Sequence, residues 1–139
     1  MDGIYVQYFL ICHEVQQDEQ DNITFCKVFD NYSIEESPSK ITFSVVVGIH
    51  HNNLEEKKLK LELMDKRKRT LAKNPFEIPL QEGENFTIAT YVLQKVPVKK
   101  GKYHAFLSID KEIIAKLQFT VDVKEGEQDE HNGCEKSGV

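Results

Sequence analysis

The sequence predicts an all-β fold, an antiparallel β-sandwich of about seven to eight strands. In most segments apolar residues alternate with polar ones at a period of two, which places one set on a core face. Clusters of turn-forming residues separate these segments, and no segment shows a convincing helical period. The chain has 139 residues, 40% of them hydrophobic, so it is long enough for one domain with a full core.

Each expected strand follows from its own pattern. Residues 54–64 are rich in helix formers, but the leucines at 59, 61 and 63 fall two apart, so we expect a strand there. The first two segments are apolar on both faces, which indicates cover from both sides or a partner on one face. The expected strands are 4–12, 23–29, 41–49, 59–63, 76–80, 86–92, 103–109 and 113–121.

Two hairpin registers follow from the apolar stripes. The last hairpin pairs Tyr103 with Phe119 and Ile109 with Ile113, which leaves a three-residue loop at 110–112. A first hairpin centred on Glu19 would place Cys12 directly opposite Cys26. These cysteines could then form a thiol pair, although two buried thiols packing as small hydrophobes is the favoured interpretation.

Compartment and domain limits follow from composition. Three cysteines, an odd number, and the absence of a signal-peptide or membrane-spanning pattern indicate a cytoplasmic protein with no membrane association. Residues 1–123 form the predicted sandwich domain. Residues 124–139 hold five acids, two lysines and almost no core-forming residue, which predicts a disordered acidic tail.

Tyr103 follows Gly101-Lys102 at the start of a late strand, so it resembles the corner tyrosine of immunoglobulin-like domains. The chain has no Trp, and Ala105 occupies the place of the second cysteine of antibody domains. Only the looser immunoglobulin-like sandwich class is therefore expected.

Several short segments across residues 8–121 resemble an uncharacterised bacterial family of small β-sandwich proteins. They are YFLIC at 8–12, KVFD at 27–30, GKY at 101–103, SID at 108–110 and FTV at 119–121. In that family the last hairpin turn tends to read Asp-Gly, whereas this chain has Lys111 in the place of the Gly. The resemblance implies a sandwich fold and no assigned activity.

No constellation of residues indicates a catalytic, cofactor or metal site. There is no nucleophile elbow and no Gly-rich phosphate loop. The adjacent His50 and His51 lack ligand partners at the usual zinc spacing, which favours a solvated loop.

Charge is distributed unevenly within the net charge of −5. Residues 1–56 hold 10 acids and 2 lysines, whereas residues 57–123 hold 14 bases and 8 acids. Four consecutive bases, Lys66, Arg67, Lys68 and Arg69, fall in a predicted turn. Because no aromatic residue is interleaved with them, a solubilising turn is favoured over a binding loop.

Three hypotheses follow. The favoured one is a non-enzymatic protein-interaction module that binds an unknown protein partner or a second copy of itself. The alternative is binding of nucleic acid or another polyanion through Lys66–Arg69. An enzyme or redox or metal protein, which would need Cys12, Cys26 or the histidines to converge, is the least favoured.

Overall fold

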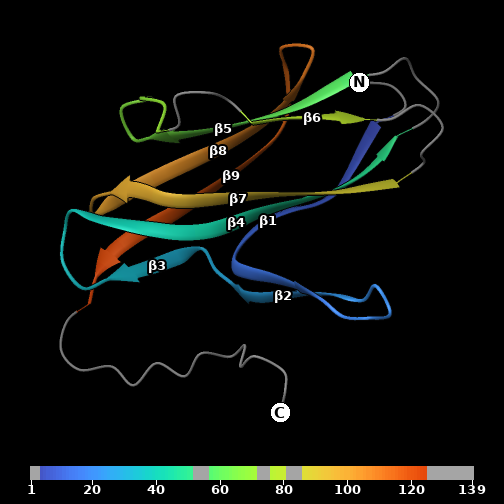
Figure 1. The fold of residues 1–139 in the computed structure, drawn as a ribbon. Coiled ribbons are helices and arrows are strands. Elements are labelled where there is room, and N and C mark those ends of the chain that lie inside the picture. The colour runs from blue at the N-terminus through green and yellow to red at the C-terminus, as the bar shows by residue number, and fades with distance from the viewer. Residues whose placement is uncertain (1–3, 52–56, 72–75, 81–85, 125–139) are drawn as a thin grey trace.

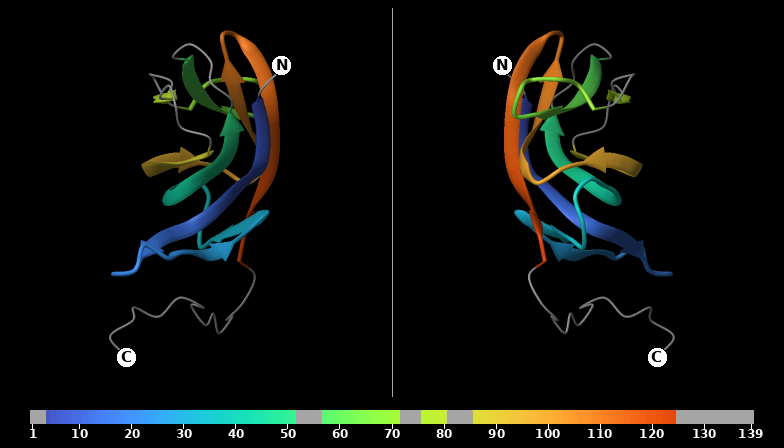
Figure 2. Two further views of the ribbon diagram at one scale, coloured as in Figure 1. Left: turned by 90° about the vertical axis from the view of Figure 1, so that its right-hand side faces the viewer. Right: turned by 90° about the vertical axis from the view of Figure 1, so that its left-hand side faces the viewer.

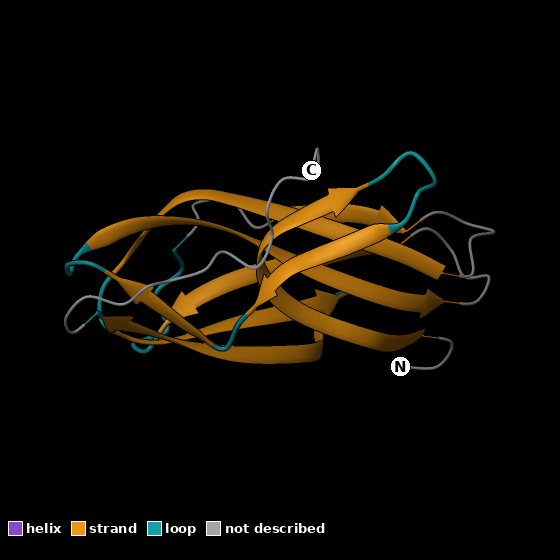
Figure 3. Cartoon of the chain, turned by 90° about the horizontal axis from the view of Figure 1, so that it is seen from below, coloured by secondary structure: helices purple, strands orange, loops and turns teal. Residues whose placement is uncertain are grey.

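The computed structural model describes residues 4–51, 57–71, 76–80 and 86–124, which contain strands and turns and no helix (Figure 3). The strands are β1 (Ile4–Gln17), β2 (Ile23–Val28), β3 (Asn31–Ile34), β4 (Ser39–His51), β5 (Lys57–Asp65), β6 (Phe76–Leu80), β7 (Phe86–Val98), β8 (Gly101–Ile109) and β9 (Glu112–Val123). The segment with helix-forming composition is strand β5, and its three leucines are buried, so the apolar period predicted its conformation correctly.

The nine described strands form two sheets that pack face to face (Figures 1 and 2). One sheet has the order β2-β1-β4-β7 and the other the order β3-β9-β8-β5-β6. The predicted β-sandwich is confirmed. The strand that the sequence did not predict is β3, which pairs with β9 in parallel, while every other described ladder is antiparallel.

The core lies between the two sheets. Phe43, Val45 and Val47 of β4 face Leu107, Phe119 and other inward side chains of the second sheet, and all of them are buried. Burial of apolar area at about 25 cal/mol per Å² is the main stabilising contribution of such a core. In both sheets, therefore, the apolar residues of each alternating pattern are the ones that face the core.

The β8–β9 hairpin has the predicted register over most of its length. Tyr103 pairs with Phe119 and Leu107 with Ala115, as expected. A register shift after Leu107 then pairs Ser108 with Ile113 and Ile109 with Glu112. The expected three-residue loop is thus wrong: the turn has two residues, Asp110 and Lys111, with φ angles of 51° and 69°. This pair of positive angles is typical of a type I′ turn, which suits the strand twist.

The β1–β2 hairpin differs from its predicted register. Glu14 pairs with Cys26 and Cys12 with Val28, so the hairpin is centred on Gln20 instead of Glu19, and the partner of each residue lies two positions further along β2 than expected. The loop of residues 18–22 explains this difference, because Asp18 accepts hydrogen bonds from the backbone N–H groups of Gln20 and Asn22 and closes the turn.

Two further expectations concern Tyr103 and the tail. The Tyr103 hydroxyl accepts a hydrogen bond from Lys99 N (2.7 Å) and donates one to Lys99 O (3.0 Å), which is the contact expected of a corner tyrosine. The predicted tail lies outside the described residues apart from Lys124, whose N–H donates to Ile34 O. The described part of the chain contains no helix of a length and apolarity that would span a bilayer.

Candidate functional site

Cys12 and Cys26, the possible thiol pair, do not lie opposite each other in the structure. Cys12 is a free cysteine, fully buried, and the register places Val28 rather than Cys26 opposite it. Burial raises the pKa of the Cys12 thiol, which disfavours the reactive thiolate. Cys26 is also buried, at 1% exposure, and lines a groove described below.

His50 and His51 belong to the end of β4 and not to a loop. Because successive strand residues point to opposite faces, the two rings diverge. The His50 ring bonds Gln7 on the outer face, whereas the buried His51 bonds the Thr87 hydroxyl at 2.8 Å. His51 pairs with Ile4, at the opposite end of the β1–β4 ladder from Cys12, so the histidines and Cys12 do not converge. Among the described residues no group of three or more His, Cys, Asp and Glu residues is placed to hold a metal ion.

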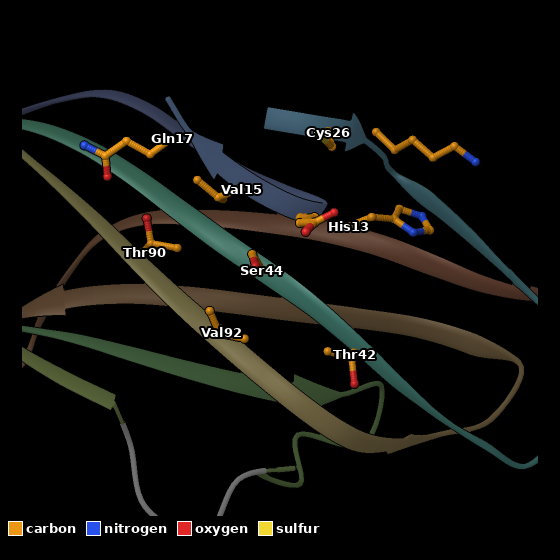
Figure 4. Close-up of a pocket in the computed structure, with 10 residues that line it drawn as sticks. His13, Val15, Gln17, Cys26, Thr42, Ser44, Thr90 and Val92 are labelled. Carbon is orange, nitrogen blue, oxygen red and sulfur yellow. The ribbon is translucent and has the colours of Figure 1, made fainter. Parts of the chain in front are cut away.

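A groove of about 620 Å³ lies between the β1–β2 hairpin and the outer face of β4 and β7. Figure 4 shows Val15 and Gln17 of the hairpin on one side and Ser44, Thr90 and Val92 of the sheet on the other. The hairpin folds over this face. Phe25 pairs with Val15 within the hairpin, and its ring also packs against the Tyr8 ring, with 5.7 Å between the ring centroids. This cover explains why Ser44 and Val46, which point away from the core, are nevertheless buried.

The rest of the outer face of this sheet is apolar and partly open. Tyr8 lies against Gly48 so closely that an added Cβ at Gly48 would be under 3.0 Å from three ring atoms. Phe86 packs edge-on against Tyr8 and close to His50, at centroid distances of 6.5 and 4.6 Å. Several apolar side chains of this sheet remain exposed: Tyr5 (65%), Val28 (56%), Val92 (53%), Phe86 (38%), Ile88 (38%) and Ile23 (37%). β1 is therefore apolar on both faces, as the sequence predicted. β7 also has apolar side chains on both faces.

The predicted basic turn is a real turn at the end of β5. The Asp65 carboxylate closes it by accepting hydrogen bonds from Arg67 N, Arg69 N and Arg69 Nε, each at 2.9 Å. These hydrogen bonds, led by that from the Arg69 N–H, hold the pKa of Asp65 below its ordinary value of 3.8. All four basic side chains of the turn are exposed. Lys73, which follows in sequence, lies outside the described residues.

The tertiary structure brings a second basic segment to this turn. Asp65 pairs with Tyr103 in the β5–β8 ladder, so the β7–β8 turn lies beside Lys66–Arg69. Lys99, Lys100 and Lys102 share a groove of about 630 Å³ with Lys66, Arg67 and Arg69. Sequence reasoning missed this convergence because the two segments are about thirty residues apart, and only strand pairing places them together.

A further groove of about 370 Å³ on the other side of the turn is lined by Lys66, Lys68 and Lys116 together with His104 and Phe106. The two rings stack at a centroid distance of 6.2 Å and an interplanar angle of 25°. The sequence showed no aromatic residue near the basic turn, yet the structure places two there. Alternation along β8, which directs residues 102, 104 and 106 to one face, is the signal that could have found them.

Comparisons with known proteins give a fold and a family. No functionally curated protein matches the chain. The chain is similar over 85% of its length to part of a β-D-glucoside glucohydrolase from Trichoderma reesei, with 10% identity and a TM-score of 0.51. It spans 18% of that enzyme, so the likeness concerns the fold of one region alone.

Two other solved structures share less of the geometry. A β-glucosidase from Listeria innocua has 14% identity and a TM-score of 0.48 over 85% of this chain and 16% of its own. A superoxide reductase (neelaredoxin) from Ignicoccus hospitalis has 12% identity and a TM-score of 0.41 over 84% of this chain and 83% of its own. The model of one protein family matches residues 7–122, and the chain therefore belongs to DUF6941, a family of unknown function.

Proposed function

We propose that this domain is a non-enzymatic protein-interaction module that pairs with a second copy of itself through strand β7. The observation that carries the proposal is a contrast between β7 and the other strands at the sheet edges. Exposed edge strands present unpaired backbone groups, and proteins usually protect them by shortness, charge, Pro or bulges.

Of the four strands at the edges of the two described sheets, three carry such protection. Strands β2, β3 and β6 have six, four and five residues, respectively. β6 includes Pro79, and Lys27 of β2 has a positive φ of 56°. These features disfavour addition of another strand at those edges.

Strand β7 has 13 residues and protection at one end only. Its C-terminal part has Lys95, with a φ of 52°, and Pro97. The N-terminal part, residues 86–93, reads FTIATYVL and has no charge and no Pro. Its outward row of Phe86, Ile88, Thr90 and Val92 is exposed. A long uncharged strand of this kind favours addition of another strand.

A second copy suits this edge because antiparallel pairing of β7 with itself is two-fold symmetric and therefore closed. The uncharged segment meets no like charge in its own copy. The two outward rows would then form one continuous apolar stripe.

The thiol and histidine positions support the non-enzymatic part of the proposal, since Cys12 is buried with a raised pKa and the histidine rings diverge.

Sedimentation velocity of the full chain over a range of concentrations tests the proposal. We expect a dimer, and we expect Ile88→Lys to be monomeric because the substitution places like charges across the two-fold axis. Ile23→Lys is the matched control: Ile23 lies on the opposite edge of the same sheet with nearly equal exposure, 37% against 38%. A wild-type chain that stays monomeric up to about 1 mM, or a dimer that Ile23→Lys disrupts as much as Ile88→Lys, would refute the proposal.

A further inference from the structure

The basic turn and its two flanking grooves form a surface that contains no residue of the 86–93 segment of β7, and we call it the basic face. The described residues that line the two grooves include eight Lys and Arg side chains and one acidic side chain, Asp65. Asp65 is already engaged by the Arg69 guanidinium and two backbone N–H groups. The remaining cations create a local positive potential in a chain whose net charge is −5.

The basic face is held in place from both sides. The Tyr103 hydroxyl ties the β7–β8 turn through Lys99, and Lys100 N donates to the Ser37 hydroxyl at 3.1 Å. Asp65 fixes the opposite turn. The lysine and arginine side chains therefore project from fixed backbone, which lowers the ordering cost of binding a ligand.

Aromatic rings lie within the same surface. In the two β8 ladders Phe106 lies between Glu62 of β5 and Lys116 of β9, and His104 lies between Met64 of β5 and Gln118 of β9. Both rings are half-buried and line the groove beside Lys66 and Lys68. A basic groove with stacked rings is the arrangement that binds single-stranded nucleic acid, because unpaired bases stack on rings while lysines contact phosphates.

We infer that the basic face binds single-stranded nucleic acid, with phosphates along Lys66–Arg69 and Lys99–Lys102 and a base on Phe106. A duplex keeps its bases stacked internally and would meet the lysines alone. An anion without bases, such as heparin, would likewise contact only the lysines and arginines and not the Phe106 ring. This inference is independent of the pairing through β7.

Fluorescence anisotropy with the full chain and a labelled oligothymidylate of about twelve nucleotides tests the inference. If about five phosphates are contacted, log K should fall with log salt with a slope near −3.5, an approximately 100-fold loss between about 50 and 200 mM salt. Lys66→Gln and Lys100→Gln should each reduce the steepness of that slope by about 0.7. Lys111→Gln, in the turn at the opposite end of β8, is the charge-matched control and should leave the slope unchanged.

The aromatic contact has its own variants. Phe106→Leu should weaken binding of the oligothymidylate by about tenfold without changing the salt slope, since it removes stacking and no charge. Phe106→Tyr keeps a ring and should retain the affinity, which distinguishes loss of stacking from loss of folding. Ile88→Lys should retain it as well, because Ile88 lines neither groove of the basic face.

Several results would overturn the inference. One is no binding at about 50 mM salt. Another is equal loss in Lys66→Gln and Lys111→Gln. A third is heparin or duplex DNA that binds as tightly as the oligothymidylate while Phe106→Leu has no effect, which would assign the surface to polyanions in general.

Discussion

Substitution of Gly48 by Ala tests the packing of Tyr8 on the outer face. An added methyl group would overlap the Tyr8 ring, which is itself held between Phe25 and Phe86. Overpacking of this kind costs about 1–3 kcal/mol. Replacing Gly by Ala inside a strand returns about 0.5–1 kcal/mol, so the net loss of unfolding free energy should be about 0.5–2 kcal/mol.

The sign of this effect should reverse when Tyr8 is absent. In a Tyr8→Ala background the obstructing ring is gone, and Gly48→Ala should stabilise the protein by about 0.5–1 kcal/mol. Urea denaturation of the four proteins of this cycle gives the coupling energy, which we expect to be about 1–3 kcal/mol. An equal loss of stability from Gly48→Ala in both backgrounds would show that the ring does not lie on Gly48.

Three other substitutions and titrations follow from single contacts. Lys111→Gly should stabilise the chain by about 1 kcal/mol, or roughly 4 °C in Tm, because Lys111 has a φ of 69° that only Gly adopts without cost. Lys111→Ala keeps the unfavourable angle, so an equal gain from it would contradict this explanation. Tyr103→Phe removes both hydrogen bonds to Lys99 and should cost about 1–3 kcal/mol in chemical denaturation, whereas Tyr5→Phe, at an exposed ring, should be close to neutral. The Asp65 carboxyl should titrate by NMR below its ordinary pKa of 3.8; because its folded pKa is lowered, its stabilising contribution is present above that value and is lost as the pH falls through the lowered pKa. A carboxyl that titrates at or above 3.8 would mean that the turn is not closed as the structure has it.

Local pattern alone predicted much of the sandwich. Alternation at a period of two identified strand β5 despite its helix-forming composition, and the apolar stripe predicted the β8–β9 register up to Leu107. These features depend on neighbours in sequence and on the need to bury one face. Tyr103 was recognisable for the same reason, since its partner Lys99 is four residues away.

Strand β3 and the exact turns were beyond such reasoning. β3 has four residues and pairs in parallel with β9, nearly ninety residues further along the chain, so its pattern is too short to recognise. The β1–β2 register depended on how the Asp18 carboxylate closes its loop, and the β8–β9 turn on a register shift after Leu107. Hydrogen bonds and bulges of this kind leave little trace in an apolar pattern.

The sequence by itself determined the fold class, the inward half of each strand and the exposed basic turn, because these depend on period and charge within one segment. Only the tertiary structure decided which strands lie at the sheet edges and which residues surround the basic turn. Strand pairing sets Asp65 beside Tyr103. This one ladder brings Lys99, Lys100, His104 and Phe106 close to a turn that in the sequence showed only a run of basic residues. The physical reason is that hydrogen-bonded ladders join residues that are distant in the chain, and a composite surface exists only once those ladders form.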